Sequence, residues 1–361
     1  MVTADLKETF LTLVRLGIGH NTSLPAGEIE WEAIEALAER HGLLGVIVDG
    51  VQKLPENQRS PQLIWLRWVG KVVQNEAQYA AQQKASTELA WMFHNNGIRA
   101  YVLKGAIVAE CYPKPSCRLS ADFDCFLVNE NQNENENNVW EIGNQVIENA
   151  GFEVKRNFYK NSTIYLPDLM VENHRYMVPF RGNERLRRLE VMLQGILKSD
   201  KGEDRFTDTW LYRPPVMVTA LFLIEHAYSH FLHEGLTWKM VLDWLLFSRK
   251  HKDEIEWNAL DEQIDEYGFR RFYDSYNRLG QYLLGEIDEV GLSELDKWML
   301  KDVWSDLTLP ASGSGLKNKL SIARNTMQAR WKYSYFTEIS MLQALLIQVK
   351  GFLFMKNPTL N

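Results

Sequence analysis

Features typical of exported, membrane-spanning or disulfide-stabilised proteins are scarce in this sequence. It has only three cysteines, an odd number without the paired spacing of a zinc site, so we expect reduced thiols in a cytoplasmic protein. The first residues, MVTADLKETF, contain no apolar stretch of signal-peptide length. The longest apolar run, VMVTALFLIEHAYSHFL, is interrupted by Glu225, His226 and His230 and is too short to span a bilayer. We therefore expect no export signal and no transmembrane segment.

An excess of positive charge is also missing. The chain has 40 Lys and Arg against 47 Asp and Glu, a formal net charge of −7, whereas surfaces that bind nucleic acid are normally basic. This argues against nucleic acid as a partner, although it leaves a local basic pocket open. Hydrophobic residues make up 45% of the 361 residues, which is ordinary for a globular protein, and the length is enough for a large core.

The pattern of apolar residues changes twice along the chain. Residues 1–96 have helical spacing, and one of the expected helices ends at Gly42, a residue typical of helix C-termini. Residues 97–213 are richer in strand formers, and residues 214–361 return to helical spacing. We therefore predict an α+β protein in which an N-terminal helical region and a C-terminal helical domain flank a small mixed β-sheet core.

Within the core, runs of strand formers alternate with helical patterns. The expected strands cover residues 98–103, 119–128, 152–160, 162–166 and 168–178. Helices are expected at residues 104–112, beginning at a glycine and ended by two prolines, and at residues 139–151. The low-complexity stretch NENQNENENN, residues 129–138, is expected to be a solvated and mobile loop.

Two aspartates one residue apart, Asp122 and Asp124, interrupt the apolar strand FDCFLV. Alternate side chains of a strand share a face, which puts the two Cα atoms roughly 6.5–7 Å apart. Carboxylates this close repel each other, and partial burial makes their charged forms costlier. A divalent cation removes both problems, since carboxylate oxygens are the ligands that Mg²⁺ prefers. For an isolated D-x-D the commoner outcome is nevertheless a solvated or backbone-capping pair.

Upstream residues supply groups that bind phosphate. Lys104 and Gly105 stand where a strand meets a helix, and a glycine at such a turn lets phosphate approach the backbone near the helix N-terminus. Arg118 and Ser120 come just before the aspartates. The alternatives are a tight turn that needs glycine for positive φ, a solvated lysine, and an arginine that merely pairs with Asp122.

The string LKGAIVAECYPKPSCRLSADFDCFLV resembles the DNA polymerase beta-like nucleotidyltransferase superfamily. It is most similar to a bacterial subgroup of uncharacterised nucleotidyltransferases, whose pattern is LKG, then Arg, then D-x-D followed by apolar residues. The helical surroundings and the later strand extend a looser match to most of the chain. The sequence departs from the wider superfamily at Lys104-Gly105, where a Gly-Ser pair is usual.

The resemblance implies a metal-dependent enzyme that moves a nucleoside monophosphate from an NTP to an unidentified acceptor and releases pyrophosphate. Asp122 and Asp124 would be catalytic and would hold two Mg²⁺ ions. The residues expected to bind the nucleotide phosphates are Lys104, Gly105, Arg118 and Ser120.

Members of the superfamily carry a third carboxylate on a neighbouring strand, which serves the metal on the side of the attacking hydroxyl. Glu172, in LMVENHRYMV, is the favoured candidate for this catalytic and metal-binding role, and Glu190, in RRLEVML, is the alternative. His174 shares a strand face with Glu172. It either contacts the nucleotide or acceptor or has a structural role.

Three histidines, His226, His230 and His233, lie on one face of an expected helix. Their spacing is compatible with zinc, but the glutamate of a zinc-protease motif is missing. The subgroup similarly has histidines in this helix followed by an Asp, here Asp243, so structural packing and pocket lining are the other interpretations. We expect packing first and pocket lining by His226 and His230 second.

Two more stretches have an ordinary and a functional interpretation. The basic cluster RGNERLRRLE contains Arg181, Arg185, Arg187 and Arg188 and is expected to be a solvated face, with attraction of an anionic substrate as the alternative. The segment LLIQVKGFLFMK, residues 345–356, is expected to be a core helix rather than a membrane-surface helix.

Two other kinds of function stay open. A catalytically inactive relative would bind a nucleotide or a partner protein through the same cleft, and a missing third carboxylate would favour it. A helical interaction protein would use the sheet only as a scaffold, and then neither aspartate would affect any ligand.

Overall fold

A computed structural model describes most of the chain. The described residues are 3–25, 27–118, 120–130, 138–157, 160–180, 183–305, 330–337, 340–343 and 346. Outside them lie Arg181, residues 131–137 of the expected loop at 129–138, and all but one residue of the segment 345–356. The predictions made for these stretches therefore stay predictions.

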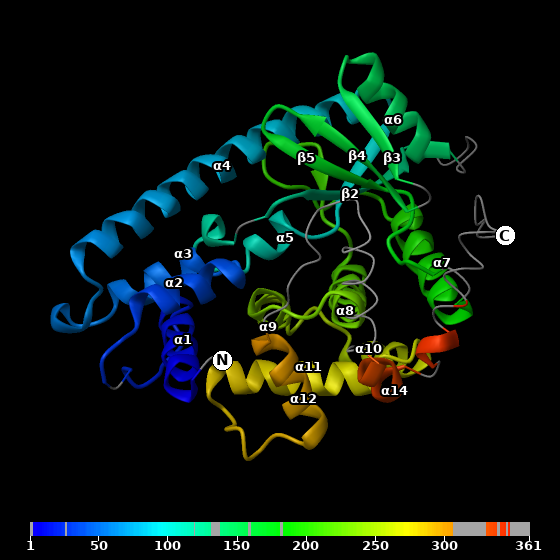
Figure 1. The fold of residues 1–361 in the computed structure, drawn as a ribbon. Coiled ribbons are helices and arrows are strands. Elements are labelled where there is room, and N and C mark those ends of the chain that lie inside the picture. Colours follow the sequence, from blue (N-terminus) through cyan, green and yellow to red (C-terminus); the bar gives the residue numbers. More distant parts are fainter. Residues whose placement is uncertain are drawn as a thin grey trace, which may run out of the picture.

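The N-terminal region is helical, as predicted. Its helices are α1 (Ala4–Gly17), α2 (Trp31–Arg40), α3 (Leu44–Gln52) and α4 (Gln62–His94). Gly42 follows α2 with a φ of +67°, the left-handed conformation that favours glycine at a helix end. The 33-residue α4 is one continuous helix that runs from the other N-terminal helices to the sheet (Figure 1).

The middle of the chain forms a six-stranded mixed sheet in the order β3-β4-β5-β2-β1-β6. The strands are β1 (Ile98–Val102), β2 (Phe123–Asn129), β3 (Glu153–Asn157), β4 (Asn161–Leu166), β5 (Leu169–His174) and β6 (Leu211–Tyr212). β2 pairs antiparallel with β1 and parallel with β5, while β3, β4 and β5 form antiparallel pairs. The α+β prediction is confirmed, and among the strands only the two-residue β6 was not anticipated.

The helices α4 and α6 (Val139–Asn149) cover one face of the sheet (Figure 1). Asn144 of α6 anchors this layer, because its Oδ1 accepts hydrogen bonds from Ser162 of β4 (2.5 Å) and Asn173 of β5 (2.9 Å). On the other face, α7 (Glu184–Ser199) contacts β2, and Phe222 packs edge-on against His174. The buried side chains of Asp124 and His174 lie on this second face.

The helix α7 contains Arg185, Arg187 and Arg188 of the predicted basic cluster and was not anticipated as a helix. Leu189, Leu193 and Leu197 form its buried stripe. On the opposite side of the helix, Arg187 pairs with Glu184 at 2.7 Å, and both side chains are open to solvent. The cluster is therefore the outer face of an amphipathic helix, as its spacing of one leucine per turn explains.

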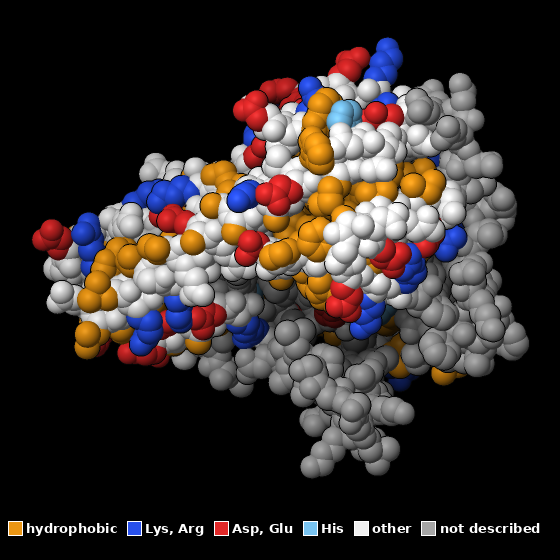
Figure 2. Space-filling model, turned by 90° about the horizontal axis from the view of Figure 1, so that it is seen from above, with side chains coloured by type: hydrophobic (Ala, Val, Ile, Leu, Met, Phe, Trp, Pro, Cys, Tyr) orange, Lys and Arg blue, Asp and Glu red, His pale blue; other side chains and the backbone are white. Residues whose placement is uncertain are grey.

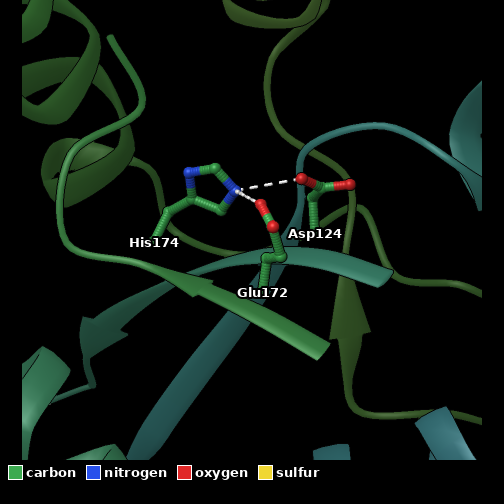
Figure 3. Close-up of side chains that lie close together, drawn as sticks. All are labelled: Asp124, Glu172 and His174. Carbon is green, nitrogen blue, oxygen red and sulfur yellow. Dashed lines mark hydrogen bonds and ion pairs between the residues drawn. The ribbon is translucent and has the colours of Figure 1, made fainter. Parts of the chain in front are cut away.

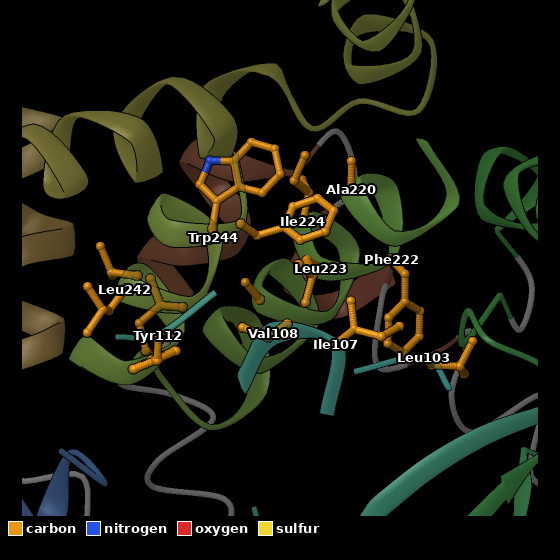
Figure 4. Packing of buried hydrophobic residues seen from close by; sticks show 14 of the residues in the cluster. Leu103, Ile107, Val108, Tyr112, Ala220, Phe222, Leu223, Ile224, Leu242 and Trp244 are labelled. Atoms are coloured by element: carbon orange, nitrogen blue, oxygen red, sulfur yellow. The ribbon is translucent and has the colours of Figure 1, made fainter. Parts of the chain in front are cut away.

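The C-terminal region is again helical. Its described helices are α8 (Val216–His233), α9 (Trp238–Lys250), α10 (Trp257–Glu266), α11 (Arg270–Leu284), α12 (Glu294–Trp304) and α14 (Arg330–Phe336). Side chains of α8 and α9 pack with those of the short α5 (Ala106–Ala109), and Figure 4 shows Ile107 and Val108 beside Ile224 and Trp244. This packing fixes the turn before α5 against the C-terminal helices.

One cluster of buried hydrophobic side chains contains residues from all three predicted regions. The regions share this core, so the predicted domain boundaries at residues 96 and 213 stay predictions. Seen from above in Figure 2, the outer surface mixes hydrophobic side chains with acidic and basic ones. No helix in the described part of the chain is long and apolar enough to cross a membrane. The cytoplasmic location also stays a prediction.

Candidate nucleotide and metal site

The parallel pairing of β2 with β5 brings two of the predicted site residues together. Asp124 is the register partner of Glu172, and Phe126 is the partner of His174. Because partners in a sheet point to the same face, Asp124, Glu172 and His174 project together. The sequence distance between the two strands is spanned by α6, β3 and β4, which is why the spacing alone did not fix the third carboxylate.

Figure 3 shows these three side chains converging from the neighbouring strands. His174 Nε2 lies 3.0 Å from Asp124 Oδ1 and 3.5 Å from Glu172 Oε2. One ligand atom from each residue lies within 4.8 Å of the others, and this is the only such group among the described residues. Asp124 and His174 are buried, whereas the side chain of Glu172 is 29% exposed.

Asp122 stands immediately before β2 and shares a cation with Asp124. Lys104 Nζ lies 3.7 Å from Asp122 Oδ2 and 3.2 Å from Asp124 Oδ2. Asp124 Oδ2 is buried and makes no hydrogen bond of good geometry, so the lysine charge is its nearest compensation. The two aspartates thus converge, as the spacing predicted.

Charge compensation decides the pKa values in this cluster. Burial opposes ionisation of Asp124, but Lys104 and the hydrogen bond from His174 outweigh it and lower the pKa of Asp124. Asp122 has weaker compensation, and burial together with the negative charge of Asp124 raises its pKa. Burial also opposes the charge of Lys104, yet Asp124 and Asp122 raise the pKa of this lysine. Lys104 and Asp124 therefore hold each other charged, whereas the surroundings of Asp122 disfavour its charged form.

His174 is fixed by acceptors on both sides of its ring. Nδ1 lies 3.3 Å from the carbonyl oxygen of Tyr176, and Nε2 faces the carboxylates of Asp124 and Glu172. A nitrogen that faces only acceptors must donate, so the geometry favours the imidazolium form. Burial opposes this form, but the hydrogen bonds to Asp124 and Glu172 raise the pKa of His174.

The predicted phosphate turn has the backbone that its glycine suggests. Gly105 has φ +70° between β1 and α5. A Cβ at this position would lie 3.4 Å from Ser120 Oγ, which itself donates to the carbonyl oxygen of Asp122 at 2.9 Å. The turn and the D-x-D segment are thus in contact. The helix that follows is much shorter than expected, four residues instead of nine, so its dipole adds little.

Arg118 is engaged elsewhere than predicted. Its Nε and Nη2 donate to the two carboxylate oxygens of Asp243 on α9 at 2.9 and 2.8 Å, and Tyr112 OH donates to the same carboxylate at 2.7 Å. Arg118 Nη1 is buried and has no hydrogen-bond partner. Sequence reasoning missed the Arg118–Asp243 pair because only the fold brings these distant segments together.

Glu190, the alternative third carboxylate, has a local structural role. Its carboxylate accepts hydrogen bonds from the backbone amides of Met177 (3.2 Å) and Val178 (2.7 Å) and from Gln194 Nε2 (2.6 Å). Burial raises its pKa to about 7. Glu190 therefore anchors the segment after β5 to α7 and does not join the cluster of Asp124 and Glu172.

The α8 histidines separate into different surroundings. His226 Nε2 lies 3.4 Å from Lys104 Nζ, and burial with the charge of Lys104 lowers the pKa of His226, so it accepts from the lysine. His230 Nδ1 lies 2.9 Å from Glu234 Oε2, and His233 Nδ1 lies 2.7 Å from the carbonyl oxygen of Ser229. They form no metal-ligand group among the described residues, and His226 borders the aspartate site.

The donor set fits a divalent cation. Asp122, Asp124 and Glu172 offer carboxylate oxygens, the ligand type that Mg²⁺ prefers, and Asp124 Oδ2 is buried without a hydrogen bond. A site of one or two carboxylates leaves positions for water and phosphate oxygens. Lys104 places one positive charge beside both aspartates, so in this structure it balances part of their negative charge.

A D-x-D strand, a neighbouring strand with a third carboxylate and a glycine turn next to them are the arrangement of the nucleotidyltransferase class. The chain belongs to the protein family described as "uncharacterised nucleotidyltransferase", whose family model matches residues 27–285. The match covers more than half of the chain and includes every residue of the cluster. Comparison with curated proteins found no match, and comparison with solved structures found none either.

Proposed function

We propose that this protein is a metal-dependent nucleotidyltransferase that moves a nucleoside monophosphate from an NTP to a hydroxyl or phosphate group of an acceptor. The convergence of Asp122 and Asp124 with Glu172 beside the glycine turn is the observation that carries the proposal. Bound Mg²⁺ would supply charge stabilisation for the attacking and leaving oxygens. The acceptor oxygen bonds to the α-phosphorus, the bond to the β-phosphate oxygen breaks, and pyrophosphate leaves with the electron pair.

The residues around the cluster divide into two sides. Asp122 and Asp124 would hold two Mg²⁺ ions, and Glu172 would complete the ligand set on the acceptor side. Lys104 and the Gly105 amide would hold nucleotide phosphates, with Ser120 keeping the turn against the D-x-D segment through its bond to Asp122. The lysine would then exchange carboxylate partners for phosphate oxygens.

His174 has a positioning role in this proposal. Its Nε2 donates to Asp124 Oδ1 (3.0 Å) and lies 3.5 Å from Glu172 Oε2, so this one nitrogen orients both carboxylates. Hydrogen bonds of this kind to ligating carboxylates typically affect metal affinity about 10–100-fold. His226 would keep Lys104 in place from the opposite side.

The acceptor would approach across β4 and β5. Glu172 pairs in register with Thr163 of β4, and the neighbouring register pair on the same face is Tyr165 and Met170. These two residues are exposed, Tyr165 by 43% and Met170 by 37%. By contrast, Asp124 is only 1% exposed. The attacking group would therefore reach Glu172 from the solvent side and lose its proton to water there.

The direct test is incubation of the protein with each α-labelled NTP, Mg²⁺ and candidate acceptors, with label transfer and pyrophosphate release as readouts. We expect transfer by the wild type and none by Asp122→Asn or Asp124→Asn. Asp168→Asn, an exposed residue in the β4–β5 turn, is the matched control and should retain activity. Wild-type protein that neither binds an NTP in a Mg²⁺-dependent manner nor turns it over would refute the proposal.

The inactive-relative alternative would be favoured by a missing third carboxylate. Glu172 stands opposite Asp124 in register, so this sign of inactivity is not found. The same experiment separates the two functions, because an inactive relative would bind NTP without releasing pyrophosphate.

A further inference from the structure

The 33-residue helix α4 has an inner face that holds it against the rest of the fold. On this face Trp68 and Leu89 are buried, and Gln82 Nε2 donates to the carbonyl oxygen of Ser120 at 3.1 Å. Asn75 lies between them and is partly buried. Because residues seven positions apart lie on the same side of a helix, residues 68, 75, 82 and 89 mark one continuous inner face.

The opposite face of α4 carries an apolar stripe that is open to solvent. Its residues alternate at intervals of three and four, and we call them the α4 seam: Leu63, Leu66, Gly70, Val73, Ala77, Ala80, Lys84, Thr87 and Trp91. Its large apolar side chains, Leu63, Leu66, Val73 and Trp91, are 57–83% exposed. A Cβ built on Gly70 would meet no atom within 4 Å. In Figure 1 α4 forms an outer edge of the molecule, and Figure 2 shows hydrophobic side chains along this edge.

The spacing of the α4 seam is that of a helix that packs along another helix in a coiled coil. An amphipathic helix normally turns its apolar stripe toward the core, whereas α4 turns this one to solvent, on the side opposite to Trp68 and Leu89. The seam extends over about 42 Å at about 1.5 Å per residue, so its partner must be a long helix with an apolar stripe. The α4 helix of a second copy is such a partner.

The α4 seam is complementary to itself when two copies of α4 pack antiparallel about the point between Ala77 and Ala80. Ala77 of each copy then lies opposite Ala80 of the other, and these small side chains let the two helices approach closely at the centre. Towards each end, Trp91 of one copy lies opposite Leu66 of the other. Both are exposed in the single chain, so this contact would remove large apolar side chains from water.

Charges beside the α4 seam agree with the antiparallel direction. Arg67 would come beside Glu88 of the second copy, once at each end of the pair. Nε and Nη2 of Arg67 bind Glu35, but its Nη1 has no hydrogen-bond partner in the described part of the chain. Glu88 is exposed. In a parallel pair Arg67 would face Gln62 and Glu88 would face Gln83, so no ion pair would form.

We propose that α4 is a dimerisation helix, which pairs antiparallel with α4 of a second copy of this chain through the α4 seam. The single charged residue of the seam, Lys84, suits this role, because one polar residue among apolar positions sets the register of a coiled coil. The inner face with Gln82 points away from the second copy, so the pairing leaves the proposed nucleotide site open. The inference does not depend on the proposed function.

The first test compares the oligomeric state of the wild type with that of Ala77→Glu by sedimentation equilibrium at micromolar concentrations. Ala77 is exposed, and Ala and Glu are both good helix formers, so the variant should fold. We expect a dimeric wild type and a monomeric variant, with a dissociation constant raised at least about 100-fold, because each dimer would bury two unpaired carboxylates. Gln78→Glu adds the same charge at the next, exposed position, away from the seam, and should stay dimeric.

Cysteine cross-linking tests the direction of the pair. Leu66→Cys and Trp91→Cys proteins should each stay unlinked when oxidised alone, whereas a mixture of the two should give a disulfide-linked dimer on a non-reducing gel. Linkage of either variant with itself, or no linkage in the mixture, would overturn the antiparallel pairing. A monomeric wild type, or an Ala77→Glu protein that stays dimeric, would overturn the proposal. A monomeric wild type that transfers nucleotides would leave the proposed function standing.

Discussion

The two faces of the sheet bury polar groups in different ways. Beneath α6, the buried polar side chains are neutral, and Asn144 is bonded to Ser162 and Asn173. On the opposite face, the buried polar groups include the ionisable side chains of Asp124 and His174, and both are paired with charged partners. The first face stabilises the fold with local hydrogen bonds, and the second depends on compensation between charges.

This difference has a physical explanation. Neutral amides and hydroxyls cost little to bury once they bond one another, whereas buried charges need partners of opposite sign and further hydrogen bonds. A face used only for packing would gain nothing from the second arrangement. The ionisable groups gather on one face, which agrees with the proposed site there. The following variants test this contrast, from the largest expected effect to the smallest.

Asp124→Asn should have the largest effect of these variants, and the effect should be on the rate of nucleotidyl transfer. The change removes a charge that Lys104 and His174 both contact and that the proposed metal site needs. We expect transfer to fall by at least about 10²–10³-fold, the range for losing one preorganised electrostatic group in an active site. Initial rates of pyrophosphate release give the measurement, with circular dichroism to verify folding. Retention of a tenth of the activity would contradict the contrast.

Asp243→Ala should be the most destabilising change. It leaves Arg118 buried without its bidentate partner, and breaking a buried pair in this way typically costs about 3–5 kcal/mol. The free energy of unfolding, measured with urea, should fall by this amount. Glu110→Ala, which breaks the more exposed pair with Arg213, should cost far less. Equal losses from the two variants would show that burial does not set the energy.

Asn144→Ala tests the packed face. The substitution leaves the Ser162 hydroxyl and the Asn173 amide without their acceptor, so we expect a loss of about 1–3 kcal/mol in the free energy of unfolding. Ser162→Ala removes one of these bonds and should cost less. Nucleotide affinity should be unchanged in both variants at temperatures where they are folded. A changed affinity would mean that the two faces are coupled.

Glu225→Gln should give the smallest effect, visible as a change in pH dependence. Burial on α8 raises the pKa of Glu225 from 4.5 to about 8. The folded chain keeps this proton up to about pH 8, whereas the unfolded chain releases it near 4.5, so the contribution of this group to stability falls as pH rises through that window. The variant should lose less stability between pH 5.5 and 8.5.

The difference in this loss should exceed about 1 kcal/mol, since one pKa unit corresponds to 1.4 kcal/mol. Urea unfolding at the two pH values is the measurement. Glu153→Gln, on the exposed edge strand β3, serves as the control and should follow the wild type. Identical pH slopes for Glu225→Gln and the wild type would show that this carboxyl is not buried as a neutral acid.

Local patterns were enough to predict much of the fold. The alternation in FDCFLV predicted β2, and the chain from Gly97 to His174 folds into the expected succession of strands and one main helix. The same alternation placed Asp122 and Asp124 together, and the structure brings both to Lys104. These predictions depend only on the period of two in a strand, which the sequence displays directly.

The other parts of the site depend on contacts between distant segments. The choice between Glu172 and Glu190 required the pairing of β2 with β5, since both glutamates follow apolar neighbours. The pairing of Arg118 with Asp243 required α9 to pack beside the loop before β2. The helix after Gly105 was predicted too long, because Pro113 and Pro115 mark its latest possible end rather than its true one.

The parallel pairing of β2 with β5 affects the order in which the chain folds. Asp124 and His174 are separated by 50 positions, so their meeting requires closure of a long loop, whereas the β4–β5 hairpin needs only local contacts. A slip of one position would turn Glu172 toward α6. We therefore expect the protein to bind a divalent ion only late in refolding, after β2 and β5 have paired in the correct register.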